Sequence, residues 1–133
     1  MMFVKSKKIN RLKYNIRGGV LISQIGRLIE TEAHKAGYRV IKNLTGHGIG
    51  RKLHEEPAEI ANYYNRFNQA GSRKNFVVAI ETFISTISAI ANTKDDGWAL
   101  AGNMGGFVAQ HEHTILVTDG KPVILTETNG IWN

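Results

Sequence analysis

Hydrophobic positions between residues 19 and 37 recur every three or four residues, which is the spacing that gives a helix one apolar stripe. The residues of this stripe are Leu21, Ile25, Leu28, Ile29, Ala33 and Ala36. Gly37 follows the stripe, and glycine commonly ends a helix. The pattern therefore predicts a helix over residues 19–37 that packs through its apolar face.

Three later segments have the composition of β-strands. The stretch "YRVIKNL" predicts a short strand, and "NFVVAIETFIST" predicts a buried one. The stretch "GFVAQHEHTILVTDGKPVILT" predicts two strands joined at Asp119-Gly120, a pair that fits a tight hairpin, and Asp96-Gly97 predicts a similar turn. A helical turn is expected after Pro57, over "AEIANYYNRF". The predicted fold class is α+β, an antiparallel sheet with packed helices.

Length and composition indicate one ordinary globular domain. The chain has 133 residues, of which 42% are hydrophobic and 21% are charged. It contains no cysteine, so a metal ion would have to be bound by histidine, aspartate or glutamate. No apolar run approaches the roughly 20 residues that span a bilayer, and the start lacks the apolar stretch of a secretion signal. We therefore predict a cytoplasmic protein without a membrane segment.

The start of the chain is strongly basic and is treated as a separate segment, residues 1–18, before a domain over residues 19–133. The net charge is +6. The basic residues of the segment are Lys5, Lys7, Lys8, Arg11, Lys13 and Arg17. Such a patch could contact RNA or an acidic surface. The alternative is a solvated terminus, which is favoured because no aromatic side chains are interleaved with these charges.

Glu81 is the first candidate for chemistry, because a carboxylate occurs midway through the predicted buried strand. Burying this charge alone is unfavourable, so it requires a cation, a hydrogen-bond network or a raised pKa. A metal ion is one such cation. A position at a strand edge or an arginine partner would be the structural alternatives.

Two further stretches carry potential metal ligands. On "FVAQHEHTILV", strand alternation places Glu112 on one face and both His111 and His113 on the other, so the three cannot bind one ion together. In "TGHGIGRKLHEEP", the surrounding glycines predict that His47 lies on a loop or an irregular strand. His47, Glu81 and Glu112 together form a donor set suited to manganese, iron, cobalt or zinc.

Three separated motifs resemble a known family. "GHGIGRKLHEEP", "AIETF" and "AQHEHTILVTDGKPVILT", with "DGW" between the last two, are similar to the C-terminal part of type I methionine aminopeptidases. The resemblance runs from about residue 20 to residue 124 or beyond. Thr82 stands where many members have proline, and His111 stands where an aromatic residue is common.

The resemblance implies the C-terminal half of a pita-bread fold, in which two pseudo-symmetric halves surround a dinuclear metal centre. That centre removes the initiator methionine from new proteins, so the substrate would be the N-terminal methionine of nascent peptides. His47 and Glu81 would bind one divalent metal, cobalt, manganese, iron or zinc, and Glu112 would bridge both metals. His54 would contact the scissile peptide as a catalytic and substrate-binding residue, and Glu81 would also relay a proton.

The family also uses two aspartates from a hairpin upstream of its glycine-rich histidine segment, whereas the first aspartate here is Asp95. Asp95, Asp96 and Asp119 fall at predicted turns, where a structural role is expected. The resemblance therefore implies at most one metal site, formed by the three retained donors, and weak or absent activity of this chain alone.

Such a half-fold is expected to self-associate, to bind a complementing N-terminal half or to be marginally stable. The alternative function is a non-catalytic pita-bread module that contacts the ribosome or RNA through the basic terminus. The retained carboxylates argue against this alternative, because a binding module has no physical need for them.

Overall fold

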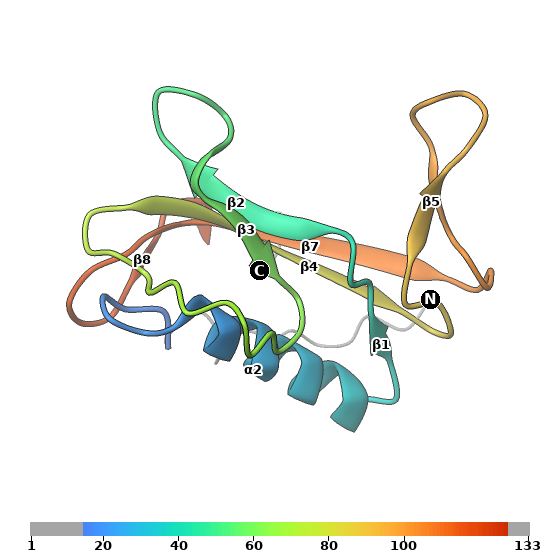
Figure 1. Ribbon diagram of the computed structural model, residues 1–133, viewed down its shortest axis with the longest axis horizontal. Helices are drawn as coiled ribbons and strands as arrows, with labels where there is room; N and C mark the ends of the chain where they lie inside the picture. The colour runs from blue at the N-terminus through green and yellow to red at the C-terminus, as the bar shows by residue number, and fades with distance from the viewer. Residues whose placement is uncertain (1–14, 128–133) are drawn as a thin grey trace.

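A computed structural model describes residues 15–127 of the protein and shows one long helix beneath an antiparallel sheet (Figure 1). The helix is α2, Ile22–Lys35. The main sheet contains β1 (Arg39–Val40), β2 (Thr45–Ile49), β3 (Glu55–Ala61), β4 (Val77–Ser85), β7 (Val108–Leu116) and β8 (Val123–Ile124). A separate hairpin contains β5 (Ala91–Thr93) and β6 (Leu100–Gly102). These elements confirm the predicted α+β class.

Strand β4 is the centre of the sheet, whose order is β3-β2-β4-β7-β8. Its whole length pairs with β7, from Val77 opposite Leu116 to Ser85 opposite Val108. Along its other edge lie both β1 and β2, which pair with opposite ends of β4. Both β1 and β2 therefore run antiparallel to β4 along the same edge, and residues 41–44 connect them.

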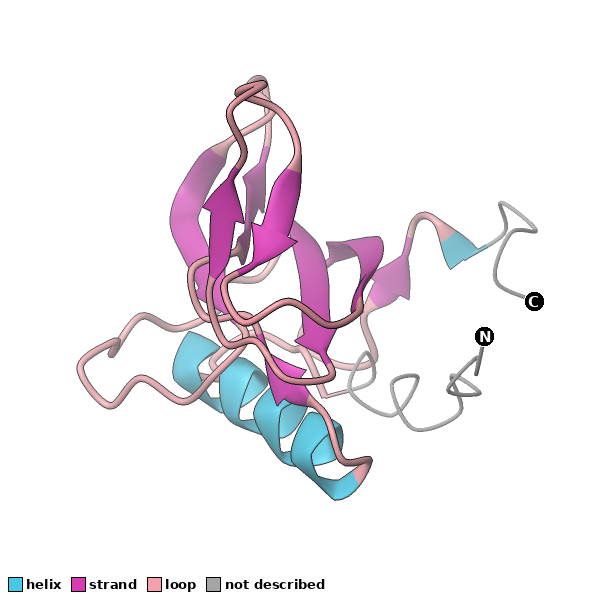
Figure 2. Ribbon diagram, turned by 90° about the vertical axis from the view of Figure 1, so that its right-hand side faces the viewer, coloured by secondary structure: helices cyan, strands magenta, loops and turns pink. Residues whose placement is uncertain are grey.

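The core lies between α2 and one face of the sheet, as both ribbon views show (Figure 2). The buried residues of α2 are Ile22, Ser23, Ile25, Gly26, Ile29 and Ala33, and they confirm the predicted helix and its apolar stripe. They meet alternate residues of the strands, among them Val78, Ile80 and Ile115. Leu28 departs from the predicted stripe, since 37% of its surface is exposed.

The helical turn predicted after Pro57 is wrong, because this segment forms β3. Thr45 pairs with Ala61 and Gly46 pairs with Ile60, so the backbone groups of the segment bond to β2 instead of to each other. Two contacts stabilise this arrangement. Ile60 is buried in the core, and Nδ2 of the buried Asn62 donates to the Leu44 carbonyl at 2.9 Å. Pairing with the preceding strand has overridden the local signal of the proline.

The predicted Asp96-Gly97 turn is confirmed, whereas Asp119-Gly120 lies in a six-residue connection over residues 117–122 and not in a tight hairpin. This connection joins β7 and β8, which pair antiparallel through Ile115 and Ile124. The Asp96-Gly97 turn joins β5 and β6, and Gly97 adopts a φ of 74° that favours glycine. In Figure 1 the β5–β6 hairpin projects away from the main sheet as a separate arm.

Of the six basic residues in the segment 1–18, five lie outside the described residues and Arg17 lies within them. The neighbouring Ile16 is 1% exposed and belongs to the core, and the Gly18 N–H donates to the Thr118 carbonyl at 2.8 Å. The division at residue 18 stays a prediction. Among residues 15–127, no helix is long and apolar enough to cross a membrane.

Candidate functional site

The sheet face turned away from α2 carries the three predicted metal donors. Glu81 on β4 stands directly opposite Glu112 on β7, and directly opposed residues of an antiparallel pair share one face. His47 on β2 stands opposite Ala79, two residues before Glu81 on the same face. The strand register therefore directs all three side chains, which come from three strands, to the same side of the sheet.

Two glycines allow β2 to fit between its neighbours at His47. A Cβ on Gly46 would lie 2.3 Å from the Ala79 carbonyl oxygen of β4, and a Cβ on Gly48 would lie 2.1 Å from the Glu56 carbonyl oxygen of β3. The pairing of β2 with β3 also shifts register between these glycines. The predicted irregular strand is confirmed, and its close contacts explain why glycines flank the histidine.

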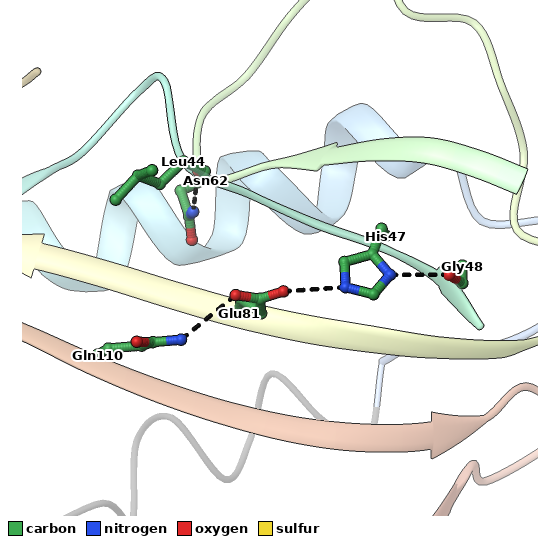
Figure 3. Close-up of polar contacts among 6 residues, drawn as sticks. All are labelled: Leu44, His47, Gly48, Asn62, Glu81 and Gln110. Atoms are coloured by element: carbon green, nitrogen blue, oxygen red, sulfur yellow. Dashed lines mark hydrogen bonds and ion pairs between the residues drawn. The ribbon is translucent and has the colours of Figure 1, made fainter. Parts of the chain in front are cut away.

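The His47 ring is held at both nitrogens (Figure 3). Its Nδ1 lies 2.8 Å from the Gly48 carbonyl oxygen, which can only accept a hydrogen bond, so Nδ1 carries the proton. Its Nε2 faces Glu81 Oε1 at 3.2 Å. In this tautomer Nε2 has a lone pair, and a lone pair facing a carboxylate oxygen requires a proton or another cation between the two atoms.

Glu81 is the most perturbed acid of the site. Burial raises the pKa of Glu81 above its ordinary value, the negative charge of Glu112 raises the pKa further, and His47 opposes both effects. The second carboxylate oxygen, Oε2, accepts a hydrogen bond of 3.3 Å from Gln110 Nε2. Glu81 is therefore held from both sides, by an imidazole and by an amide, while its charge remains only partly compensated.

The spacing of His47 and Glu81 suits two ligands of one divalent cation. Two ligands at about 2.1 Å from one ion are about 3.0 to 3.4 Å apart in octahedral or tetrahedral geometry, and the His47 and Glu81 atoms are 3.2 Å apart. A cation would also offset the repulsion between Glu81 and Glu112 that raises the pKa of Glu81. Within residues 15–127, however, no three histidine or acidic side chains already form a closed group. Glu112 remains exposed and is the donor that would have to turn toward the pair.

His54 lies beside His47 at the open end of β2. The two ring centroids are 4.0 Å apart and the rings are tilted by 41°. His54 precedes the start of β3 and is exposed, whereas His47 is buried. His54 thus adjoins the donor pair from the solvent side, and its predicted contact with a substrate peptide stays a prediction.

The two histidines of β7 point to the opposite face, as strand alternation predicted. His113 is 3% exposed, and its Nδ1 lies 2.7 Å from Thr126 Oγ1. The His111 and His113 rings meet edge to face at 4.6 Å. Sequence reasoning did not assign a role to Gln110, although its position two residues before Glu112 placed it on the face that carries Glu81.

The comparisons with known proteins identify the family of the chain. The model of metallopeptidase family M24 matches residues 7–119. The chain belongs to this family. It is 46% identical over 111 residues to methionine aminopeptidase 2 of Bacillus subtilis. The aligned region is 84% of this chain and 45% of that protein.

Two solved structures of family members have the same fold. The methionine aminopeptidase from Thermotoga maritima superposes with a TM-score of 0.84 at 32% identity, covering 92% of this chain and 49% of that chain. The enzyme from Rickettsia prowazekii gives a TM-score of 0.82 at 30% identity, covering 92% and 50%. These matches confirm the expected pita-bread half and the resemblance to methionine aminopeptidases.

The chain spans about half the length of the relatives it matches. Membership of a metallopeptidase family implies dependence on a divalent metal.

Proposed function

We propose that this chain carries the histidine and glutamate half of a methionine aminopeptidase site and binds one divalent cation through His47, Glu81 and Glu112. The observation that carries the proposal is the contact of His47 with Glu81, next to a second carboxylate in direct register. The names of the relatives support peptides with an N-terminal methionine as the substrate class.

The residues of the site would divide the work of peptide hydrolysis. A bound cation supplies Lewis-acid polarisation of a peptide carbonyl and lowers the pKa of water. Glu81 would hold and move a proton, for which its raised pKa is suitable. The Gly48 carbonyl would fix the tautomer and orientation of His47, and the exposed ring of His54 would contact the scissile peptide.

Two of the three aspartates of this chain, Asp96 and Asp119, are already engaged at turns and are not free ligands for a second cation. Asp96 is occupied in its turn, where it accepts the backbone N–H groups of Trp98 and Ala99 at 2.9 and 2.8 Å. Asp119 forms an ion pair with Lys74 at the β7–β8 turn. We therefore propose that two-metal peptide hydrolysis requires donors beyond those of residues 15–127, supplied by a complementing segment or protein.

Calorimetric titration of manganese or cobalt into the chain tests the proposal. We expect no more than one equivalent to bind, and Glu112→Gln and Glu81→Gln to weaken binding strongly. Glu59→Gln is the matched control, because Glu59 is an exposed glutamate of β3 outside the donor set. A cation at about 100 times its Kd should stabilise the fold by about 2.7 kcal/mol.

Cleavage of Met-Ala-Ser, measured with and without the N-terminal half of a related enzyme, tests the activity. We expect cleavage only when that half is added. Tight binding of two cations by the pure chain, with full activity, would refute the ligand count. Binding that is unchanged in both site variants would refute the donor set and favour a non-catalytic module.

A further inference from the structure

Residues 62–76 form a segment with an unusual composition that the proposed site does not use. The segment contains no acidic residue. Its aromatic and basic residues are Tyr63, Tyr64, Phe67, Phe76, Arg66, Arg73 and Lys74. Most of the remaining residues are amides or small residues. Aromatic side chains interleaved with positive charges are the feature that the basic terminus of the sequence lacks.

The segment runs along α2 in the opposite direction and is fixed to it at both ends. At one end the Tyr64 N–H donates to Glu30 Oε2 at 3.3 Å. At the other end the Ile22 N–H donates to the Ala70 carbonyl at 2.9 Å, and the Ser72 N–H donates to the Val20 carbonyl at 2.8 Å. Figure 1 shows the segment passing in front of α2 before it enters β4.

Three arginines stack on the aromatic rings of this surface. Arg66 lies 4.8 Å from the ring centre of Phe67, Arg27 of α2 lies 5.3 Å from that of Tyr64, and Arg73 lies 5.7 Å from that of Phe76. Phe67 is 79% exposed and Tyr64 is 43% exposed. Among residues 15–127, no salt bridge involves any of the three arginines.

The turn that carries Phe67 is held by its own amide side chains. Asn65 Oδ1 accepts the Phe67 N–H at 3.0 Å, and Asn68 Oδ1 accepts the Ala70 N–H at 3.0 Å. Gln69 Nε2 donates to the Arg66 carbonyl at 2.7 Å. The backbone of the turn is therefore held in place before any ligand arrives, which lowers the backbone entropy that binding would lose.

We infer that this arginine–aromatic surface, formed by residues 63–76 and Arg27, binds single-stranded nucleic acid. Bases would stack on Phe67 and Tyr64, and phosphates would contact the arginines, which is the combination by which proteins bind single strands without sequence preference. Residues 63–76 contain no acidic side chain, and their exposed rings alternate with cations and amides, so the surface complements a polyanion that also offers flat rings for stacking. The inference is independent of the metal site.

Fluorescence anisotropy with a labelled oligouridine of about 15 nucleotides tests the inference on the whole chain. Two pairs of variants distinguish binding through this surface from binding through the net positive charge of the protein. Phe67→Ala is compared with Phe107→Ala, since Phe107 is 84% exposed and lies just before β7, outside the proposed surface. Arg66→Ala is compared with Arg51→Ala, an exposed arginine in the β2–β3 turn that gives the same change in net charge.

We expect Phe67→Ala to weaken binding about 5- to 100-fold through the loss of one stacked base, and Phe107→Ala to leave it unchanged. Arg66→Ala should lower the slope of log K against log salt by about 0.7, and Arg51→Ala should not. Oligothymidine in place of oligouridine distinguishes DNA from RNA, and binding of either supports the inference.

Circular dichroism and urea unfolding establish that all four variants are folded before binding is compared. Equal effects within each matched pair would overturn the inference, because they would show binding through net charge alone. Preference for a duplex, tighter binding of polyglutamate than of oligouridine, or no binding of the wild type at about 50 mM salt would also overturn it.

Discussion

Replacing Gly26 by alanine sets two effects of opposite sign against each other. Gly26 lies inside α2, where alanine is favoured over glycine by about 1 kcal/mol. It is also buried where the helix meets the segment after β3. A Cβ at this position would lie 2.2 Å from the Tyr63 carbonyl oxygen and 2.6 Å from the Ala61 carbonyl oxygen. Both atoms belong to the backbone, so no side-chain rotation can relieve the contact.

The steric effect should exceed the gain in helix propensity. Overpacking in a tight core destabilises by about 1 to 3 kcal/mol, and we place this case at the upper end because the helix or the segment must shift as a whole. The net loss of stability for Gly26→Ala should therefore be about 2 kcal/mol. For a domain of this size the loss corresponds to a Tm lower by about 8 °C.

Urea unfolding followed by circular dichroism measures this loss, and Gly120→Ala is the control. No atom lies within 4 Å of a Cβ built on Gly120, so that variant should change stability by less than about 0.5 kcal/mol. A Gly26→Ala protein that is as stable as the wild type would refute the close contact between α2 and the segment, and with it the fixed geometry of the arginine–aromatic surface.

Three other perturbations test the site, a turn and the core. The pKa of Glu81 is raised above 4.5 in the folded protein, so protonation of Glu81 stabilises the fold fully below pH 4.5, and this stabilisation is lost as the pH rises through the folded pKa. Urea unfolding across this pH range should show the loss in the wild type and not in Glu81→Gln. Hydrogen bonds from the Ala99 and Trp98 N–H groups lower the pKa of Asp96 below 3.8, and carbon-detected NMR should find that the Asp96 carboxyl titrates below this value. Asp96→Ala should speed amide hydrogen exchange at Trp98 and Ala99. Ile115→Ala should lower the free energy of unfolding in urea by about 2 to 5 kcal/mol, whereas a loss below 1 would contradict the described core.

The elements that the sequence predicted well are those whose signal is local. The apolar stripe of α2, the continuous apolar run of β4 and the Asp96-Gly97 turn each contain their own evidence within a few residues. Strand β3 is different, because Pro57 and its neighbours suggest a helical turn when they are read alone. These residues form a strand because they pair with β2, whose glycines allow β3 to come close. The pairing depends on the contacts between the two strands and not on the local sequence of β3.

The residues of the candidate site were selected from the sequence, whereas their contacts could not be predicted from it. A glutamate inside an apolar strand and a histidine between glycines are unusual enough to be selected from the sequence, and alternation correctly separated Glu112 from His111 and His113. The 3.2 Å contact of His47 with Glu81 depends on the register of two separate strand pairs. The hydrogen bond from Gln110 to Glu81 crosses one of these pairs diagonally, and no sequence signal specifies it.

Strand β4 links the stability of the fold to the chemistry of the site. Val78 and Ile80 face α2 in the core, while Ala79 and Glu81 face the other side. A slip of one residue would turn Glu81 into the core, so the apolar face fixes the register that holds Glu81 opposite Glu112. Substitutions on the core face should therefore change cation binding only through unfolding, and substitutions on the site face should change cation binding while the fold remains. Measuring stability and cation affinity in the same variants separates these two effects.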